Sequence, residues 1–339
     1  MIYFTKMQAA GNDFVVIDAR DNLLKISSEI AKKIADRKYG IGCDQVLIME
    51  RSLKADVKIR IYNADGSEAF ACGNGARCVA WLCMEKYGSK SVRLETGDQI
   101  LISTIAGDNR LFSKPISSSK VEGAYEAQNR SVLDIHEGHW GKSQIPPKPH
   151  EDSSIEATNK FAEEIELRKK SNIRPLYSGF SGLNYVAVNM GTLKINKELT
   201  ETFQKEFEEK ILFVSLGNNH IVFFDDFFKK KGIFEEKMKK NNKIAHYNVE
   251  FIHVINKHQI EANVFERGVG ETLSCGSGAV ASAFAAASLG HCSFPINVQM
   301  KGGVLTVDFA ENREELVLSG PVVLVFTGQI SKEILNNEF

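Results

Sequence analysis

The sequence predicts an α/β (α+β) fold made of two similar domains, and three observations point to it. Strand and helix patterns alternate through residues 1–112, and the same scheme returns through residues 183–326. One short glycine-containing motif opens a predicted helix in each part. Between them, residues 113–182 carry few apolar side chains, so no core is expected there. With 339 residues and 43% hydrophobic composition, the chain can bury one large or two ordinary cores.

The first part contains predicted helices over residues 28–39 and 75–87, each followed by a glycine. In the earlier helix, Ile30, Ile34 and Ala35 share one face, which is the spacing of an amphipathic helix. Strands are predicted where short apolar runs or period-two alternation occur, at residues 2–4, 14–18, 46–49, 57–62, 92–95 and 100–105.

The second part repeats this order. Its predicted helix covers residues 278–289 and is followed by Gly290. Apolar runs of strand length surround it, at residues 185–190, 211–215, 221–224, 251–255, 262–265, 297–301, 304–309, 316–319 and 322–326. Two copies of one structural unit predict two related domains rather than a longer repeat array.

Residues 113–182 differ from both parts. They hold a serine run, three prolines near residue 147 and a charged run over residues 163–170, where a solvated helix over 156–170 is compatible with the sequence. Connections longer than about 12–15 residues are usually functional or without fixed structure. We therefore expect a mobile insertion without a catalytic part.

Charge and hydropathy restrict the partners. Lys plus Arg is 42 and Asp plus Glu is 43, so the net charge of −1 gives no reason to expect nucleic acid or an anionic membrane surface. The start of the chain lacks a signal-peptide core, and the small-apolar stretch over residues 279–289 is too short to span a bilayer. We expect a cytoplasmic protein with a small-molecule substrate, and a homodimer remains open.

Six cysteines are present, and none forms a C-x-x-C pair. Neither a zinc site nor a disulfide framework is expected in such a chain, so the cysteines are predicted to be free thiols. Cys43, Cys78, Cys83 and Cys292 are interpreted as small buried hydrophobic residues.

The other two cysteines begin the repeated motif C-G-x-G-A. Cys72-Gly73-Asn74-Gly75-Ala76 corresponds to Cys275-Gly276-Ser277-Gly278-Ala279, and the cysteines are 203 residues apart (275 − 72). A cysteine at a helix start lies near unpaired backbone N–H groups and the positive end of the helix dipole, and both favour the thiolate. The same N–H groups can bind a carboxylate.

Two such helix starts facing each other would hold an amino-acid carboxylate between two sulfurs. One thiol could remove the α-proton and the other return it from the opposite face, while the N–H groups stabilise the developing negative charge. The sequence carries no recognisable pyridoxal-phosphate motif. We therefore predict cofactor-independent inversion of one α-carbon, with Cys72 and Cys275 as acid and base.

Outside the insertion, the chain resembles diaminopimelate epimerases over nearly its whole length. The resemblance rests on seven stretches, which begin at Gly11-Asn12-Asp13-Phe14, Gly40-Ile41-Gly42-Cys43, Arg60-Ile61-Tyr62-Asn63, Cys72-Gly73-Asn74-Gly75, Gly217-Asn218-Asn219-His220, Asn248-Val249-Glu250-Phe251 and Glu266-Arg267-Gly268-Val269. It implies two pseudo-symmetric domains, residues 1–112 and 183–326, each a mixed sheet wrapped around a central helix. It also implies that the tail 327–339 joins the first domain.

The resemblance further implies conversion of LL-2,6-diaminopimelate to meso-diaminopimelate in lysine and peptidoglycan-precursor biosynthesis. His220 and Glu266 would tune the pKa values of the thiols, and Arg267 would pair with the distal carboxylate. The implied substrate contacts are Asn12, Gln45, Asn63, Gly73, Asn74, Asn218, Asn248, Glu266, Arg267, Gly276 and Ser277. Asn219 and Ser277 depart from the family's usual proline and threonine.

Three other functions remain as alternatives. A two-cysteine racemase for proline or histidine would not need polar contacts for a second charged end, which this chain offers at Asn63, Asn218, Asn248 and Arg267. A non-catalytic binding protein would not need both cysteines. A dithiol redox protein would have no use for an amide-rich pocket.

Overall fold

A computed structural model describes residues 2–21, 26–105, 184–224, 244–310 and 314–331. The insertion 113–182, its compatible helix 156–170 and most of the tail 327–339 lie outside these ranges. The domain limits predicted from the sequence therefore remain predictions. The described residues of both halves belong to one compact unit.

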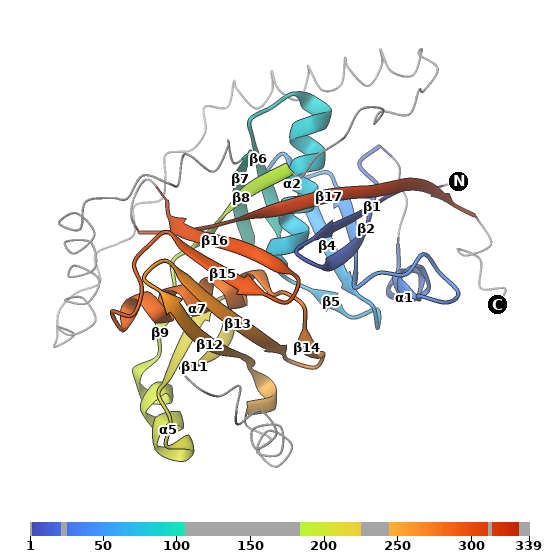
Figure 1. The fold of residues 1–339 in the computed structure, drawn as a ribbon. Helices are drawn as coiled ribbons and strands as arrows, with labels where there is room; N and C mark the ends of the chain where they lie inside the picture. Colours follow the sequence, from blue (N-terminus) through green and yellow to red (C-terminus); the bar gives the residue numbers. More distant parts are fainter. Residues whose placement is uncertain (1, 22–25, 106–183, 225–243, 311–313, 332–339) are drawn as a thin grey trace. The chain divides into compact units, whose positions relative to one another are not determined.

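The first half is built mainly of strands around one long helix (Figure 1). Helix α1 (Ser28–Ala35) begins at Ser27, whose side chain accepts the N–H of Ile30, and helix α2 spans Gly73–Tyr87. The strands are β1 (Ile2–Ala9), β2 (Asn12–Asp18), β3 (Gln45–Glu50), β4 (Val57–Asn63), β5 (Glu68–Ala69), β6 (Ser91–Thr96), β7 (Gln99–Ile105) and β8 (Asn184–Gly191). The sequence assigned β8 to the second part, but it pairs with β7 and packs against α2.

The second half is likewise built mainly of strands around one long helix. Helix α7 (Gly276–Ser288) is its long helix, and α5 (Lys197–Phe207) and the short η3 (Ile244–His246) precede it. The strands are β9 (Lys194–Ile195), β10 (Ile211–Leu216), β11 (Asn218–Phe224), β12 (Asn248–Asn256), β13 (Gln259–Glu266), β14 (Gly270–Thr272), β15 (Ile296–Met300), β16 (Gly303–Phe309) and β17 (Leu316–Ile330).

The strand pairings of the two halves correspond one to one. In the first half β2 and β3 are parallel, β3 and β4 antiparallel, and β4 and β6 parallel. In the second half β11 and β12 are parallel, β12 and β13 antiparallel, and β13 and β15 parallel. The predicted α/β class with two pseudo-symmetric halves is confirmed.

In each half the strands surround the long helix. Helix α2 packs against β1, β2, β6, β7, β8 and β17, and α7 packs against β10, β11, β12, β13, β15, β16 and β17. Every residue from Gly73 to Met84 in α2 is buried, and α7 is buried along most of its length. A helix covered on all sides must be apolar around its circumference, which explains the alanine-rich sequence of α7.

Strand β17 connects the halves. Its first part pairs with β16 and β8, and residues 323–330 pair with β1 in the register Ile2↔Ile330 to Gln8↔Val323 (Figure 1). The sequence predicted two strands here, interrupted at Gly320-Pro321, and that prediction is wrong. The glycine is required because a Cβ at Gly320 would lie 2.4 Å from Leu305, while Pro321 remains in register with Tyr185.

Two helix predictions need correction. The predicted helix 28–39 ends at Ala35, because the Asp36 carboxylate accepts the N–H groups of Lys38 and Tyr39 and closes a turn. Helix α5 was not predicted, although Asn196 caps its first turn and its buried Phe203 and Phe207 are four residues apart.

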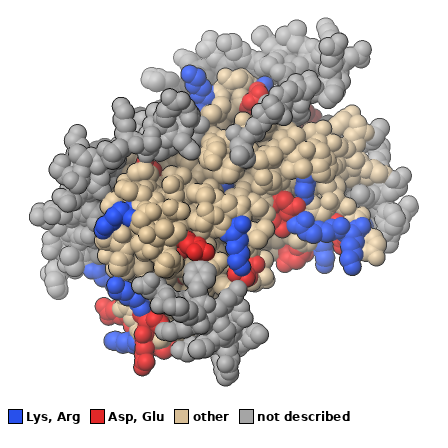
Figure 2. Space-filling view, in the orientation of Figure 1, with Lys and Arg blue, Asp and Glu red and all other residues tan. Residues whose placement is uncertain are grey.

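Charges are mixed on the surface that Figure 2 shows, where Lys and Arg lie among Asp and Glu over the described residues. This agrees with the near-zero net charge of −1. Within the described part of the chain, none of the helices combines the length and the apolar character that crossing a bilayer requires.

Candidate active site

Both motif cysteines occupy the same structural position. Cys72 is the N-cap of α2 and its Sγ accepts the N–H of Gly75 at 3.3 Å, while Cys275 is the N-cap of α7 and accepts the N–H of Gly278 at 3.4 Å. Cys72 is half-buried and Cys275 is buried. Each sulfur thus satisfies one of the free N–H groups at its helix start.

The first turns of the two helices touch. A Cβ placed on Gly276 would lie 3.3 Å from the Cα of Gly73, and 3.5 Å from the backbone N of Asn74. Asn74 Nδ2 also donates to Ser274 Oγ at 3.0 Å, in a buried hydrogen bond between the halves. The two positive helix ends therefore converge, and the motif glycines allow this close approach.

Strand ends bring the predicted amide side chains to each helix start. Parallel strands begin at Asn12, Gln45, Asn218 and Asn248, and the antiparallel neighbours end at Asn63 and Glu266. The Gln45 Nε2 donates to Asn63 Oδ1 at 2.9 Å. The Asn248 Oδ1 accepts the backbone N–H of Arg267 at 3.0 Å.

A buried pair lies beneath the start of α7. His220 Nδ1 and Glu250 Oε1 are 2.7 Å apart, and both side chains are fully buried. Glu250 Oε1 would be 2.8 Å from a Cβ at Gly278, so the carboxylate contacts the first turn of α7. Only glycine leaves room for it there.

The carboxylate of Glu266 interacts electrostatically with both thiols. Its Oε1 accepts a hydrogen bond from Thr272 at 2.7 Å. Burial raises the pKa of Glu266, an effect opposed by the hydrogen bond from Thr272. The charge of Glu266 raises the pKa of both Cys72 and Cys275.

The surroundings of both thiols raise their pKa values. Burial raises the pKa of Cys72 to about 11, against the opposing N–H of Gly75. Burial and the charges of Glu266 and Glu250 raise the pKa of Cys275 well above its ordinary value. The N–H groups at the helix starts lower both pKa values, in the direction that the motif predicts, but loss of solvation acts against them more strongly.

One buried cation supports the start of α2. Arg77 is fully buried and its NH2 group donates to Asn74 Oδ1 at 2.9 Å. Because Asn74 in turn donates to Ser274, the three residues form a chain of two hydrogen bonds. Burial lowers the pKa of Arg77 to about 10. Its charge lowers the pKa of Cys72 and partly offsets the effect of burial.

A profile of the diaminopimelate epimerase family matches residues 4–115 and 212–325. A diaminopimelate epimerase of Caldanaerobacter subterraneus subsp. tengcongensis is 33% identical over 96% of this chain and 98% of the relative. One from Herminiimonas arsenicoxydans is 32% identical over 97% of this chain and 99% of the relative.

The chain belongs to the diaminopimelate epimerase family. This confirms the resemblance drawn from the seven sequence stretches and makes the protein an isomerase of the epimerase class.

Solved structures share the epimerase fold at low sequence identity. A phenazine biosynthesis protein of the PhzF family from Bacillus anthracis has a TM-score of 0.56 at 14% identity, covering 97% of this chain and 99% of that one. A probable proline racemase from Agrobacterium radiobacter K84 has a TM-score of 0.55 at 11% identity, covering 98% and 93%. At these identities the similarity concerns the fold.

Within this epimerase site, sequence reasoning assigned no role to Glu250, Arg77 or Asp44. Glu250 directly precedes a predicted strand and Arg77 stands in an apolar helix, and both side chains are buried in the structure. A charged residue inside an apolar pattern is a signal for a buried functional group. Asp44 gave no such signal, because aspartate is common at strand starts and turns.

Proposed function

We propose that this epimerase inverts one α-carbon of LL-2,6-diaminopimelate and gives meso-diaminopimelate, using Cys72 and Cys275 as its two acid–base groups. The observation that carries the proposal is the meeting of two cysteine-capped helix starts at Gly73 and Gly276. Inversion needs an acid and a base on opposite faces of one carbon, and a pair of equivalent helix starts offers such an arrangement.

The reacting carboxylate binds at the two helix starts in this proposal. The backbone N–H groups of Gly73-Asn74 and Gly276-Ser277 supply donors, and the dipoles of α2 and α7 point their positive ends at the same place. As the α-proton leaves, negative charge moves onto the carboxylate, where these donors stabilise it. Such fixed donors reduce the need for a separate electron sink.

Burial of the thiols suits this chemistry. An α-proton beside a carboxylate is a weak acid, so a thiolate of ordinary basicity would remove it poorly. A thiolate in a desolvated site is more basic, as the raised pKa of Cys72 indicates. One sulfur starts as the thiolate and takes the α-proton, while the other starts as the thiol and gives its proton to the opposite face of the carbon, so one turnover exchanges the protonation states of the two sulfurs and leaves the net charge unchanged.

The distal part of the substrate meets the amide-rich strand ends. Arg267 follows β13, and its guanidinium suits a bidentate contact with a carboxylate. Asn63 ends β4, and Asn218 and Asn248 begin the neighbouring strands β11 and β12, so all three offer amide groups to the distal ammonium and carboxylate. These assignments favour a substrate with two charged ends over proline.

We also propose a cytoplasmic location. All six cysteines are free in the structure, and free thiols persist in a reducing compartment.

The test uses purified full-length protein and LL-2,6-diaminopimelate in deuterated water without added cofactor. We expect meso-diaminopimelate to form with deuterium at the inverted carbon while the remaining substrate stays mostly protonated at early times. Proline and histidine serve as competing substrates. Faster racemisation of proline, or no turnover of diaminopimelate, would reject the proposed substrate, and equal early labelling of both isomers would reject two separate bases.

A further inference from the structure

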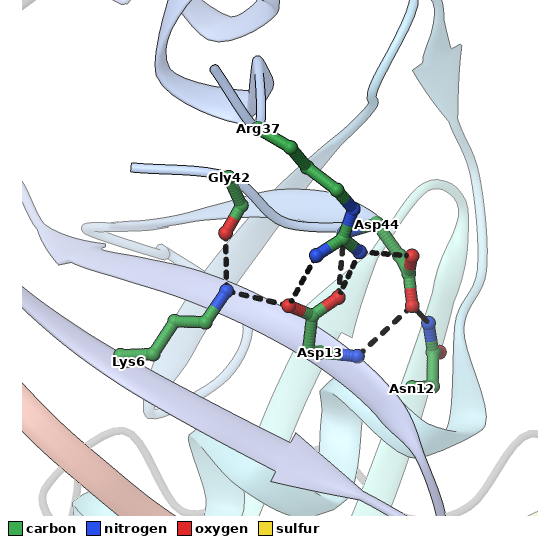
Figure 3. A network of polar contacts seen from close by, with 6 residues as sticks. All are labelled: Lys6, Asn12, Asp13, Arg37, Gly42 and Asp44. Carbon is green, nitrogen blue, oxygen red and sulfur yellow. Dashed lines mark hydrogen bonds and ion pairs between the residues drawn. The ribbon is translucent and has the colours of Figure 1, made fainter. Parts of the chain in front are cut away.

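A network of charged side chains lies at the starts of β2 and β3, in contact with Asn12 (Figure 3). Asp44 Oδ2 accepts the backbone N–H of Asp13 at 3.0 Å, and Asp13 Oδ1 accepts that of Asp44 at 3.0 Å. Arg37 pairs with both carboxylates, at 2.7 Å to Asp13 and 2.8 Å to Asp44. Lys6 pairs with Asp13 at 2.6 Å and also donates to the carbonyl of Gly42.

The network keeps its carboxylates in fixed positions. Although burial by itself raises the pKa of Asp13, the hydrogen bonds and charges of Arg37 and Lys6 outweigh it and hold the pKa at about 2. The backbone donors of Asp13 and Asp44 fix each carboxylate against the other strand. An ionised carboxylate accepts hydrogen bonds and cannot donate them.

The carboxylate of Asp44 determines which way the Asn12 amide points. Asn12 Nδ2 donates to Asp44 Oδ2 at 2.8 Å, and Asn12 Oδ1 lies 3.9 Å from Cys72 Sγ, in the direction of an S–H donor (Figure 3 shows the contact with Asp44). An amide whose nitrogen faces an obligate acceptor must turn its oxygen the other way. Here that oxygen faces the thiol.

The orientation has a chemical consequence. A carbonyl oxygen can accept the proton of a thiol but repels a thiolate, whereas an amide nitrogen would donate to a thiolate. We propose that Asp44 is a positioning residue that acts through Asn12, holding the amide so that its oxygen favours the protonated form of Cys72. The inference rests on the proposed function of Cys72, but its test measures the thiol directly and needs no substrate.

The first variant removes the acceptor. In Asp44→Ala the amide of Asn12 can turn its nitrogen to the sulfur, so the thiolate gains a donor. The pH midpoint of Cys72 alkylation by iodoacetamide, followed by peptide mapping of the intact protein, should fall by about 0.5–1 unit. The midpoint of Cys275 should not move. Equal shifts at both cysteines, or none at Cys72, would overturn the proposal.

A second variant separates orientation from charge. Asp44→Asn removes the same negative charge but keeps a side-chain oxygen that can accept from Asn12. Orientation predicts that Asp44→Asn keeps most of the wild-type midpoint, whereas a pure charge effect predicts the same shift as in Asp44→Ala. An identical shift in the two variants would therefore reject the positioning role.

The chain offers a matched control and a reserve variant. Asp56 also accepts a backbone N–H, from Arg93 at 2.7 Å, and pairs with the Arg93 guanidinium at 3.2 Å, so Asp56→Ala should leave the Cys72 midpoint unchanged. If Asp44→Ala does not fold, Arg37→Gln decides, because the Arg37 side chain is 59% exposed. Arg37→Gln removes an ion-pair partner of Asp44, and if Asp44 then holds Asn12 less firmly, the pH midpoint of Cys72 alkylation falls. Loss of the positive charge of Arg37 alone would raise that midpoint. A raised or unmoved midpoint overturns the inference.

Discussion

The two halves share a backbone but surround their cysteines with different side chains. In the first half a Cβ at Gly75 would meet Leu47 at 3.1 Å and Phe14 at 3.4 Å. In the second half the equivalent Gly278 faces Glu250, which is paired with His220. The registers Phe14↔Gln45 and His220↔Asn248 place His220 where the first half has phenylalanine. A buried histidine–glutamate pair thus replaces an apolar pair.

Two further positions differ in charge. Asn63 and Glu266 each precede their cysteine by nine residues (72 − 63 and 275 − 266), and both end the middle antiparallel strand. Arg77 follows Cys72 by five residues (77 − 72), and the corresponding residue of α7 is Val280. Near its cysteine, the first half therefore carries the buried cation Arg77, and the second half carries the carboxyl groups of Glu250 and Glu266.

The comparison shows how a symmetric scaffold can hold two unequal acids. Backbone N–H groups stabilise both sulfurs in the same way, since each cysteine is an N-cap. The inequality comes from side chains at equivalent positions, because Glu266 raises the pKa of both thiols, whereas Glu250 raises that of Cys275 further and Arg77 lowers that of Cys72. Which thiol ionises first is thus a local electrostatic property.

The largest effect should come from removing either thiol. We expect Cys72→Ala and Cys275→Ala to lower kcat by about a thousandfold or more, because each direction of the reaction needs both groups. The buried Cys78 is the control, and Cys78→Ala should cost only about 1–2 kcal/mol of stability. Steady-state assays with purified variants measure this. Near-normal turnover in Cys72→Ala would remove that residue from the mechanism.

A graft tests the buried pair directly. Glu250→Leu leaves His220 without the partner that now lies 2.7 Å away, and should destabilise the protein by about 3–5 kcal/mol. The double variant His220→Phe/Glu250→Leu copies the Phe14–Leu47 pair and should recover most of that loss in urea unfolding. This double variant should stay poorly active if the His220–Glu250 pair tunes the pKa of Cys275. Full activity in a stable double variant would mean that the pair serves folding alone.

The buried cation should make the thiols react in a fixed order. We expect iodoacetamide to modify Cys72 at lower pH than Cys275, because Arg77 opposes the effect of burial on the Cys72 pKa. Arg77→Met should slow Cys72 alkylation at pH 8 by about tenfold, which corresponds to one pKa unit. Peptide mapping over a pH series gives both rates. The two cysteines reacting alike would remove the proposed inequality.

The smallest effect concerns stability in acid, because the pKa shifts of carboxyl groups in the two halves have opposite signs. Ion pairs with Arg20 and Lys86 outweigh burial and hold the pKa of Asp18 at about 2, below its ordinary 3.8. Its contribution is therefore present above pH 3.8 and is lost as the pH falls toward 2. Burial raises the pKa of Glu266, so its contribution is present below the ordinary 4.5 and is lost at higher pH.

Urea unfolding at several pH values separates these contributions. Asp18→Asn should flatten the loss of stability between about pH 4 and 2 by about 1–2 kcal/mol, a figure reduced for the partial exposure of the side chain. Glu266→Gln should instead flatten the loss above its ordinary pKa. An unchanged acid slope in Asp18→Asn would assign the acid sensitivity to other groups.

The fold class, the two halves and the two cysteines could be read from the sequence. These features follow from local patterns, since apolar periodicity, glycines after helices and a repeated motif are readable without distant contacts. The motif predicted both cysteines at helix starts, and in the structure Cys72 and Cys275 are the N-caps of α2 and α7. The family resemblance was equally readable, because it rests on short contiguous stretches.

Only the tertiary structure decided the charge environment of each thiol. Glu250 and His220 come from different strands and pair only because β11 and β12 are parallel in one particular register. Burial, which raises the pKa of Cys72, likewise depends on how the sheets enclose α2 and α7. Solvation and electrostatic interactions act through space rather than along the chain, so local sequence patterns do not encode them.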